Sequence, residues 1–155
     1  MSGIGIKRAA VIATTISSFI GGGLALAPSA NATTQTLEVR ALNLAVKHKG
    51  DPYQYGATGP HRFDCSGLTQ YVYKHVTNGK KLARTAADQY RNSKHVKWAN
   101  RKIGDLVFFH SGSSTSSIDH VGIYAGHGYI WHAPHSGAKV RKEKIWTNKF
   151  WLGRY

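Results

Sequence analysis

The segment that decides the fold runs from residue 63 to residue 76 and reads FDCSGLTQYVYKHV. Asp64 is a favourable residue to cap the start of a helix, and Asn78-Gly79 is a common way to end one. The segment therefore predicts a helix over Cys65–Val76, with Cys65 in its first turn. The apolar residues recur at helical spacing, at Leu68, Tyr71, Val72 and Val76.

Outward from this helix, the chain changes from helical to strand-like patterns. We expect an earlier helix over Thr36–Val46, a Gly- and Pro-rich loop over Tyr53–His61 and a short helix over Arg84–Tyr90. Helices first and an antiparallel sheet second indicate an α+β domain. The predicted strands are Asp105–Phe109, His120–Ala125, Tyr129–Ala133, Lys139–Arg141 and Phe150–Tyr155.

Two histidines flank a predicted hairpin. A three-residue loop over Gly126–Gly128 makes His132 oppose Gly122 and lie diagonally from His120 on the same face, about 7–8 Å away between backbones. An unbulged two-residue loop would separate the histidines, so the hairpin needs an odd-length loop or a β-bulge. The opposite face then carries the apolar residues Val121, Ile123 and Ala125.

Cys65 is the only cysteine of the chain and has no partner for an internal disulfide. Unpaired N–H groups and the dipole at a helix N-terminus favour a thiolate, so we expect a lowered pKa and a reactive thiol. The alternative is a small buried apolar residue, as many free cysteines are. A thiol nucleophile also needs a general base held by a third group, and the hairpin supplies His120 and His132 as candidates.

Metal binding is the competing chemistry for the same residues. Cys65, His120, His132 and His135 would supply four zinc ligands, but the sequence has no CxxC, HExxH or other compact ligand motif. We therefore expect neither a metal nor another cofactor.

The first 32 residues have the pattern of a secretory signal peptide. The basic pair Lys7-Arg8 precedes an apolar run over Ala9–Leu26, and Ala30-Asn31-Ala32 is a cleavage pattern. The alternative is an uncleaved anchor, but the glycines and hydroxyls of the run suit a bilayer poorly. We expect a protein secreted to the cell wall or the extracellular space. Residues 33–155 should form one domain and a monomer without stable membrane association.

The predicted mature chain is strongly basic. Without Lys7 and Arg8, 19 of the 21 basic side chains remain against 7 acidic ones, which gives a net charge of +12. Such a charge attracts polyanions, and anionic wall polymers are one such class. Nucleic acid is another, but no aromatic–basic recognition motif is present and we do not expect it as a partner.

Five strings of residues, taken in order, resemble the NlpC-type peptidoglycan endopeptidases, which are papain-like cysteine peptidases of bacterial walls. The resemblance covers residues 36–155 and implies a papain-like fold. The strings are Asp51–Gly56 (DPYQYG), Arg62–Leu68 (RFDCSGL), Gly104–Phe109 (GDLVFF), His120–Tyr124 (HVGIY) and His132–Pro134 (HAP).

The resemblance also implies roles for individual residues. The nucleophile of the family falls on Cys65, its general base on His120 and its third polar residue on His132. Its substrate-binding positions fall on Tyr53, Asp64, Ser66 and Arg84. Many members have tryptophan where this chain has Tyr55.

The activity implied by the resemblance is hydrolysis of an amide bond in the stem peptide of peptidoglycan. The typical bond joins the γ-carboxyl group of D-glutamate to a diamino acid. Three alternatives stay open: a cell-wall amidase, an acyltransferase with the same thiol site, and a cationic wall-binding protein without catalysis.

Overall fold

The computed structural model describes residues 35–155, and the predicted signal peptide lies outside this range. Within the range, the helices are α1 (Leu37–Lys47), α2 (Cys65–Val76) and α3 (Ala86–Arg91). No helix of residues 35–155 is long and apolar enough to cross a membrane. The strands are β1 (Lys94–Val96), β2 (Leu106–His110), β3 (Ile118–Gly126), β4 (Tyr129–His132), β5 (Arg141–Lys144) and β6 (Phe150–Arg154).

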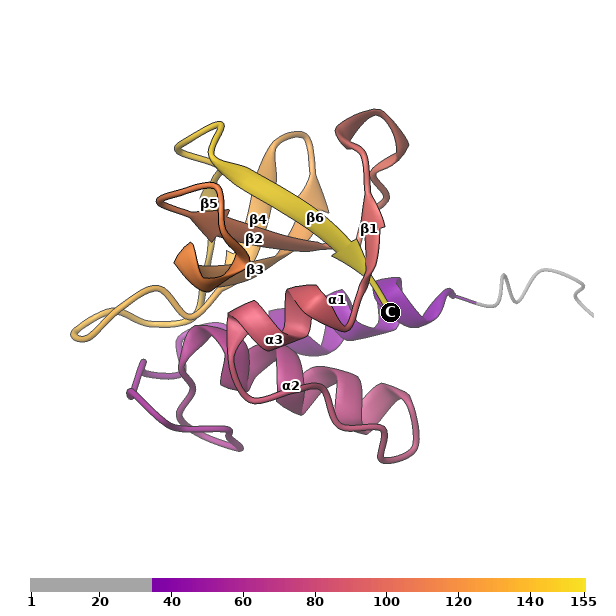
Figure 1. The fold of residues 1–155 in the computed structure, drawn as a ribbon. Helices are drawn as coiled ribbons and strands as arrows, with labels where there is room; N and C mark the ends of the chain where they lie inside the picture. Colours follow the sequence, from indigo (N-terminus) through magenta and orange to yellow (C-terminus); the bar gives the residue numbers. More distant parts are fainter. Residues whose placement is uncertain (1–34) are drawn as a thin grey trace, which may run out of the picture. The chain divides into compact units, whose positions relative to one another are not determined.

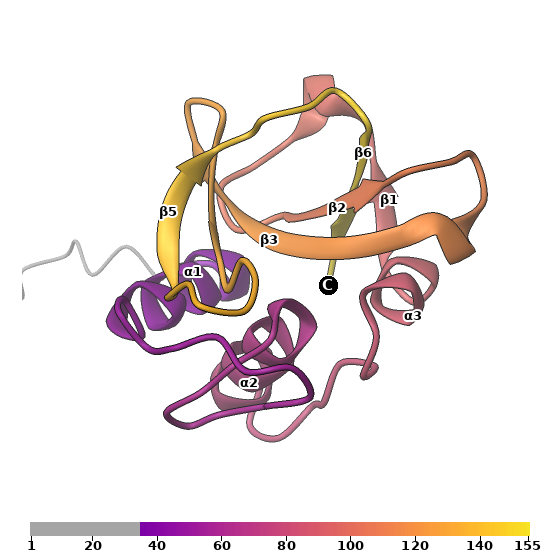
Figure 2. The same cartoon turned by 90° about the vertical axis from the view of Figure 1, so that its left-hand side faces the viewer.

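The strands form one sheet in the order β1-β6-β2-β3-β4-β5. Every neighbouring pair is antiparallel. Figures 1 and 2 show the three helices gathered on one side of this sheet. The predicted α+β fold, with helices first and an antiparallel sheet second, is therefore confirmed.

The start of α2 is fixed by side-chain capping and by close packing. The Gly67 amide donates to Asp64 Oδ1 over 2.7 Å, which satisfies one of the free N–H groups of the first turn. A Cβ at Gly67 would lie 2.0 Å from the Ala57 carbonyl oxygen, so only glycine lets the preceding loop lie against the helix start. After the helix, Asn78 and Gly79 have φ angles of 54° and 107°, as the sequence signal predicts.

Both faces of the central strands are covered. Leu106 and Phe108 of β2 face the main core, which includes α2 residues such as Leu68 and Val72. On the predicted apolar face of β3, Val121 and Ile123 are fully buried. A second apolar cluster covers the other face of the sheet, so Tyr124 is buried too. The second cluster consists of Val107, Phe109, Tyr124, Ile130 and Leu152.

The hairpin of β3 and β4 is built with the bulge rather than the longer loop. Its turn is His127-Gly128, with φ angles of 53° and 76°, and the register shifts between Tyr124 and Gly126. Of the two expected solutions, an odd-length loop or a β-bulge, the structure has the bulge, and Ala125 is the extra residue. Beyond the bulge, Ile123 opposes Trp131, which is the predicted register.

Three of the strands differ clearly from the prediction. β3 begins at Ile118, two residues before the predicted start at His120. β5 begins at Arg141, two residues after the predicted start at Lys139, and consists of polar and charged residues. β1 was not predicted, since its three residues carry no clear alternation and owe their pairing to the distant β6.

Candidate active site

The two predicted histidines are in contact. Nε2 of His120 lies 2.8 Å from Nδ1 of His132, and their rings meet edge to face. His132 is only 2 % exposed. The diagonal placement across the hairpin is thus as predicted, and the catalytic roles of these histidines stay predictions.

A carboxylate from β5 extends this pair. Oε2 of Glu143 lies 3.1 Å from Nε2 of His132 and accepts a 2.8 Å hydrogen bond from Nε of Arg141. The pKa of Glu143 is lowered, because hydrogen bonds from Arg141 and His132 outweigh the effect of burial. The sequence prediction missed Glu143, since the strand that carries it was placed too early in the chain.

An indole covers the histidines from the side of solvent. Trp146 stacks on Phe109 with ring centroids 4.3 Å apart, and its ring lies 5.8 Å from that of His120 and 5.6 Å from that of His132. Burial lowers the pKa of His120 to about 3, with the neighbouring His132 as the second cause. Burial also lowers the pKa of His132 to about 4, against the opposing effect of Glu143. Both rings are therefore neutral at neutral pH.

The thiol of Cys65 lies at the start of α2 beside the residue that follows His120. The backbone of Val121 and both the backbone and the side chain of Ser66 favour the thiolate, which acts to lower the pKa of the thiol. Burial is the larger influence, and together with the Asp64 carboxylate it raises the pKa of Cys65. The expectation of a lowered thiol pKa is therefore wrong, because desolvation outweighs the helix N-terminus here.

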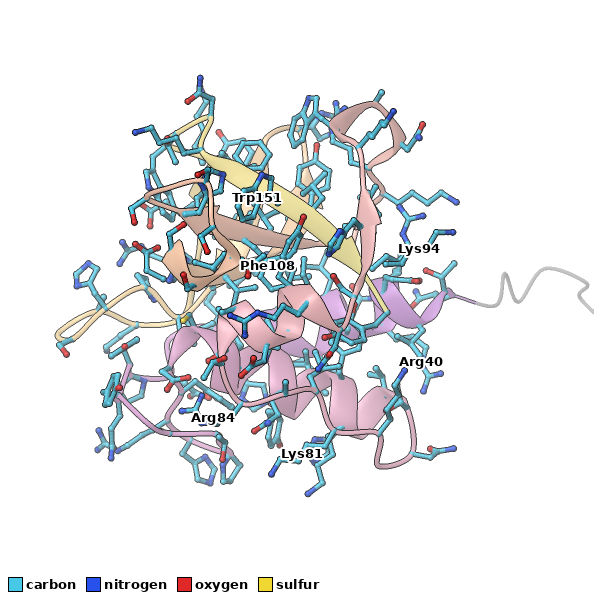
Figure 3. All side chains as sticks on the ribbon, viewed as in Figure 1. Arg40, Lys81, Arg84, Lys94, Phe108 and Trp151 are labelled. Carbon is cyan, nitrogen blue, oxygen red and sulfur yellow. The ribbon has the colours of Figure 1, made fainter. Side chains whose placement is uncertain are left out.

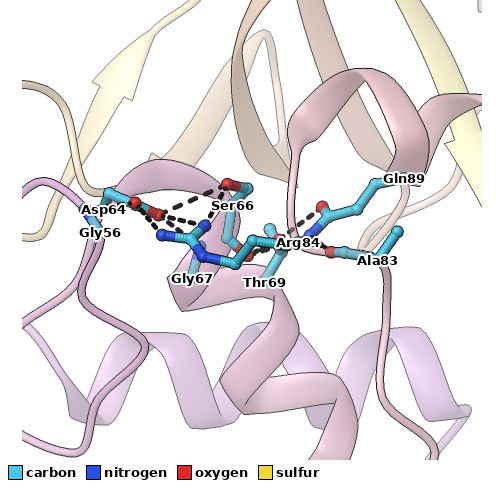
Figure 4. Close-up of polar contacts among 8 residues, drawn as sticks. All are labelled: Gly56, Asp64, Ser66, Gly67, Thr69, Ala83, Arg84 and Gln89. Atoms are coloured by element: carbon cyan, nitrogen blue, oxygen red, sulfur yellow. Dashed lines mark hydrogen bonds and ion pairs between the residues drawn. The ribbon is translucent and has the colours of Figure 1, made fainter.

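Asp64 is the centre of a polar cluster at the start of α2 (Figure 4). Its carboxylate accepts hydrogen bonds from the amides of Gly56 and Gly67 and from both terminal nitrogens of Arg84. Arg84 also donates to Ser66 Oγ over 2.9 Å. These contacts use the Asp64 oxygens within the protein, so the carboxylate positions the helix start. Its predicted part in substrate binding stays a prediction.

Two adjoining pockets contain the predicted site residues. One pocket, of about 420 Å³, contains the thiol and is lined by residues that include Tyr53, Cys65 and Arg84. The other, of about 480 Å³, is lined by His120, His132 and their neighbours. Asp119 lines both, at a register shift of β3 that leaves it without a partner on β2. A bulge is a common way to re-aim a side chain, and nothing in the sequence motifs indicated this one.

The tyrosine of the thiol pocket lies within electrostatic reach of the nucleophile candidate. Burial raises the pKa of Tyr53; a thiolate at Cys65, when it forms, and the Asp64 carboxylate raise it further. Tyr53 therefore keeps its proton and can donate a hydrogen bond into the pocket. Among residues 35–155, no three side chains of His, Cys, Asp or Glu are gathered as a metal site would require.

A family model described as the NlpC/P60 family matches residues 50–155. The chain belongs to the NlpC/P60 family. The matched range includes all the predicted site residues of this NlpC/P60 domain, from Tyr53 to His132.

Two curated relatives are named as endopeptidases. The chain is 39% identical over 120 residues to a "Probable endopeptidase" of Corynebacterium glutamicum, which covers 77% of this chain and 54% of the relative. It is 32% identical over 133 residues to the murein DD-endopeptidase MepH of Escherichia coli K12, which covers 84% of this chain and 48% of the relative. The chain thus spans about half the length of these two relatives.

A solved structure supports the same family. The NlpC/p60 domain of the peptidoglycan hydrolase SagA has a TM-score of 0.68 and 30% sequence identity to this chain. The alignment covers 76% of this chain and 98% of the SagA domain. The papain-like α+β architecture expected from the sequence is thereby confirmed for this NlpC/P60 domain.

Proposed function

We propose that this protein is a cysteine endopeptidase that hydrolyses an amide bond in the stem peptides of peptidoglycan. The observation that carries the proposal is the contact between His120 and His132, in a pocket that shares Asp119 with the pocket of the thiol at the start of α2. A nucleophile, a base and a group that orients the base are the parts that thiol-dependent amide hydrolysis needs. We further propose that the protein is secreted and acts in the cell wall, as its first 32 residues predict.

The resting site holds a thiol and a neutral imidazole, because burial raises the pKa of Cys65 and lowers that of His120. In the proposed first step, the proton moves from Cys65 to His120 while the sulfur attacks the carbonyl carbon. Charge therefore separates only as the reaction proceeds. The backbone N–H of Cys65 and the hydroxyl of Tyr53 are the proposed donors to the oxyanion.

The second half of the reaction returns the proton. His120 protonates the leaving amine as the carbon–nitrogen bond breaks, and the acyl group stays on Cys65 as a thioester. His120 then removes a proton from water, which attacks the thioester and releases the new carboxylate and the thiol. His132 keeps the His120 ring in place throughout these steps.

Digestion of purified peptidoglycan, followed by mass spectrometry of the fragments, tests this function. Wild-type protein should release stem-peptide fragments, and Cys65→Ala should release none. Activity of Cys65→Ala equal to that of the wild type would exclude the thiol as nucleophile. Thermal unfolding of both proteins serves as the control, since a loss of activity counts only if the variant is folded.

The same experiment identifies the bond. Cleavage between D-glutamate and the diamino acid leaves a free γ-carboxyl group on glutamate, and we propose this bond. One relative is named a DD-endopeptidase, and cleavage between two D-residues would leave different termini. Amidase activity would separate the whole stem peptide from the sugar, and acyl transfer would join fragments rather than release them.

A second candidate is binding of anionic wall polymers without catalysis. A pocket of about 410 Å³, distinct from the two site pockets, is lined by Lys74, His75 and Lys81 but by no acidic side chain. Other basic residues lie on separate elements, as Figure 3 shows for Arg40 on α1 and Lys94 on β1. Salt-sensitive binding that survives Cys65→Ala, with no turnover of peptidoglycan by the wild type, would favour this candidate.

A further inference from the structure

Glu143 lies at the end of a chain of hydrogen bonds that begins at the proposed base. Its Oε2 is 3.1 Å from Nε2 of His132, and the other nitrogen of that ring is 2.8 Å from Nε2 of His120. Both nitrogens of the buried His132 ring are therefore occupied by named partners. The geometry leaves one nitrogen of the pair, Nδ1 of His120, outside this chain.

The direction of these hydrogen bonds follows from the chemistry of the partners. An ionised carboxylate can only accept hydrogen bonds, so Nε2 of His132 must carry a proton and donate to Glu143. A neutral His132 then has a lone pair on Nδ1, which must accept from Nε2 of His120. A neutral His120 with its proton on Nε2 has its lone pair on Nδ1, where it can take the proton of a thiol.

If Nε2 of His132 had no hydrogen-bond acceptor, the two histidines could also adopt the opposite pattern of protonated nitrogens. His132 could then carry its proton on Nδ1 and donate it to Nε2 of His120. His120 would carry its own proton on Nδ1 and would have no lone pair for the thiol. With the Glu143 carboxylate, His120 has a lone pair on Nδ1 and can act as a base toward the thiol. Without the carboxylate, His120 can carry a proton on Nδ1 and cannot act as that base.

The strand geometry holds Glu143 in this place. Arg141 is the direct register partner of His132 across β4 and β5, and Glu143 follows two residues later on the same face. Nε and Nη2 of Arg141 lie 2.8 Å and 2.7 Å from Glu143 Oε2, and these contacts keep the carboxylate ionised against the effect of its partial burial. The other titratable groups of this pocket are Asp119 and His135.

We propose that Glu143 is a positioning residue that selects the protonated nitrogens of both histidines and so leaves Nδ1 of His120 as the base for Cys65. This inference rests on the proposed function for its catalytic consequence. Its structural content, the pattern of protonated nitrogens, does not depend on any activity. Two kinds of measurement therefore test it separately.

The first measurement is the imidazole ¹⁵N NMR spectrum of the full protein, which distinguishes protonated from unprotonated ring nitrogens. At about pH 7, His120 and His132 should both carry their proton on Nε2. Assignment uses His120→Gln and His132→Gln. A proton on Nδ1 of His132 in the wild type would overturn the proposal, whatever the enzyme's activity. The predicted pattern in a protein that cleaves no peptidoglycan would instead refute only the proposed function.

The second measurement compares kcat and KM on a defined stem peptide for two variants. Glu143→Leu has no acceptor, and its kcat should fall roughly 10- to 100-fold, as loss of an outer partner commonly costs, with KM little changed. Glu143→Gln keeps an acceptor oxygen without the charge and should recover most of that loss. Equal losses in the two variants, or a kcat of Glu143→Leu within about twofold of wild type, would overturn the proposal.

The matched control is Asp51→Asn, which changes another carboxylate paired with a histidine, His48, over 2.8 Å. This pair lies outside the pockets of the site, so kcat and the ¹⁵N spectrum of His120 and His132 should not change. If Glu143→Leu does not fold, the ¹⁵N spectrum of the wild type still decides the proposal, because it needs no substitution at position 143.

Discussion

Gly122 of β3 lies directly against His132 of β4. A Cβ at position 122 would be 3.3 Å from the Cβ of His132 and 2.7 Å from Cδ1 of Ile130. A side chain at this point would press against His132, whose ring reaches His120, and would displace the Ile130 side chain. The glycine of the HVGIY string is therefore part of the geometry of the histidine pair.

Gly122→Ala should move His132 away from His120. We expect a kcat reduced by at least roughly tenfold, since small displacements of catalytic groups are costly. Crowding against Ile130 should lower the free energy of unfolding by about 1–3 kcal/mol. Peptide hydrolysis and urea denaturation measure the two effects. Gly128→Ala is the control, because nothing lies within 4 Å of its Cβ position and any loss there reflects its positive φ angle alone.

The Asp64 cluster should contribute separately through its helix cap and its ion pair. Asp64→Asn keeps an oxygen for the Gly67 amide but loses the charge opposite Arg84, whereas Asp64→Ala loses both. We expect Asp64→Ala to be less stable than Asp64→Asn by about 1 kcal/mol, the usual value of a cap. Urea denaturation measures this difference. Equal stability of the two variants would mean that the cap contributes nothing at this helix.

The acid limb of the activity profile should lie at unusually low pH. The proposed base must be neutral, and its folded pKa of about 3 means that the neutral form is lost only as the pH falls through that region. An unperturbed histidine would lose it near pH 6.5. We therefore expect kcat/KM to stay nearly constant between about pH 7 and pH 5. A limb centred near pH 6.5 would show that the ring is hydrated in solution.

Replacing Trp146 by alanine should shift the acid limb of the pH–activity profile to higher pH. The indole is 52% exposed itself, yet it covers the rings of His120 and His132. Water admitted by Trp146→Ala favours the charged imidazolium and raises the pKa of His120 toward its ordinary value. The measurement is kcat/KM against pH, with Trp146→Phe as the variant that keeps a ring stacked on Phe109. If the acid limb of Trp146→Ala is unchanged, the desolvation of His120 comes from the rest of the sheet and not from Trp146.

The parts of the fold that local sequence signals control could be predicted. α2 begins at Cys65 and ends at Val76 as expected, because Asp64 and Asn78-Gly79 act on neighbouring backbone groups. The contact of His120 with His132 could also be predicted, since residue alternation and one bulge decide it. The direction of the pKa shift of Cys65 could not be predicted, because it depends on burial by segments that are distant in the sequence. No local sequence pattern contains that information.

The position of Glu143 in the site could not be predicted from local sequence signals either. Its strand, β5, has a polar and charged sequence without an apolar alternation, so its register depends on the pairing of Arg141 with His132. A carboxylate in a polar strand is ordinarily a surface residue. Only the assembled sheet places it behind a buried histidine.

The protonated state of Cys65 has a consequence for the lifetime of the proposed nucleophile. Peroxides and disulfides react with thiolates, and their reaction with a thiol that keeps its proton is slow. Since burial and Asp64 raise the pKa of Cys65 and so keep it a thiol, the resting protein should resist oxidation to sulfenic acid. A nucleophile that is activated only by its substrate can persist where free thiolates are consumed.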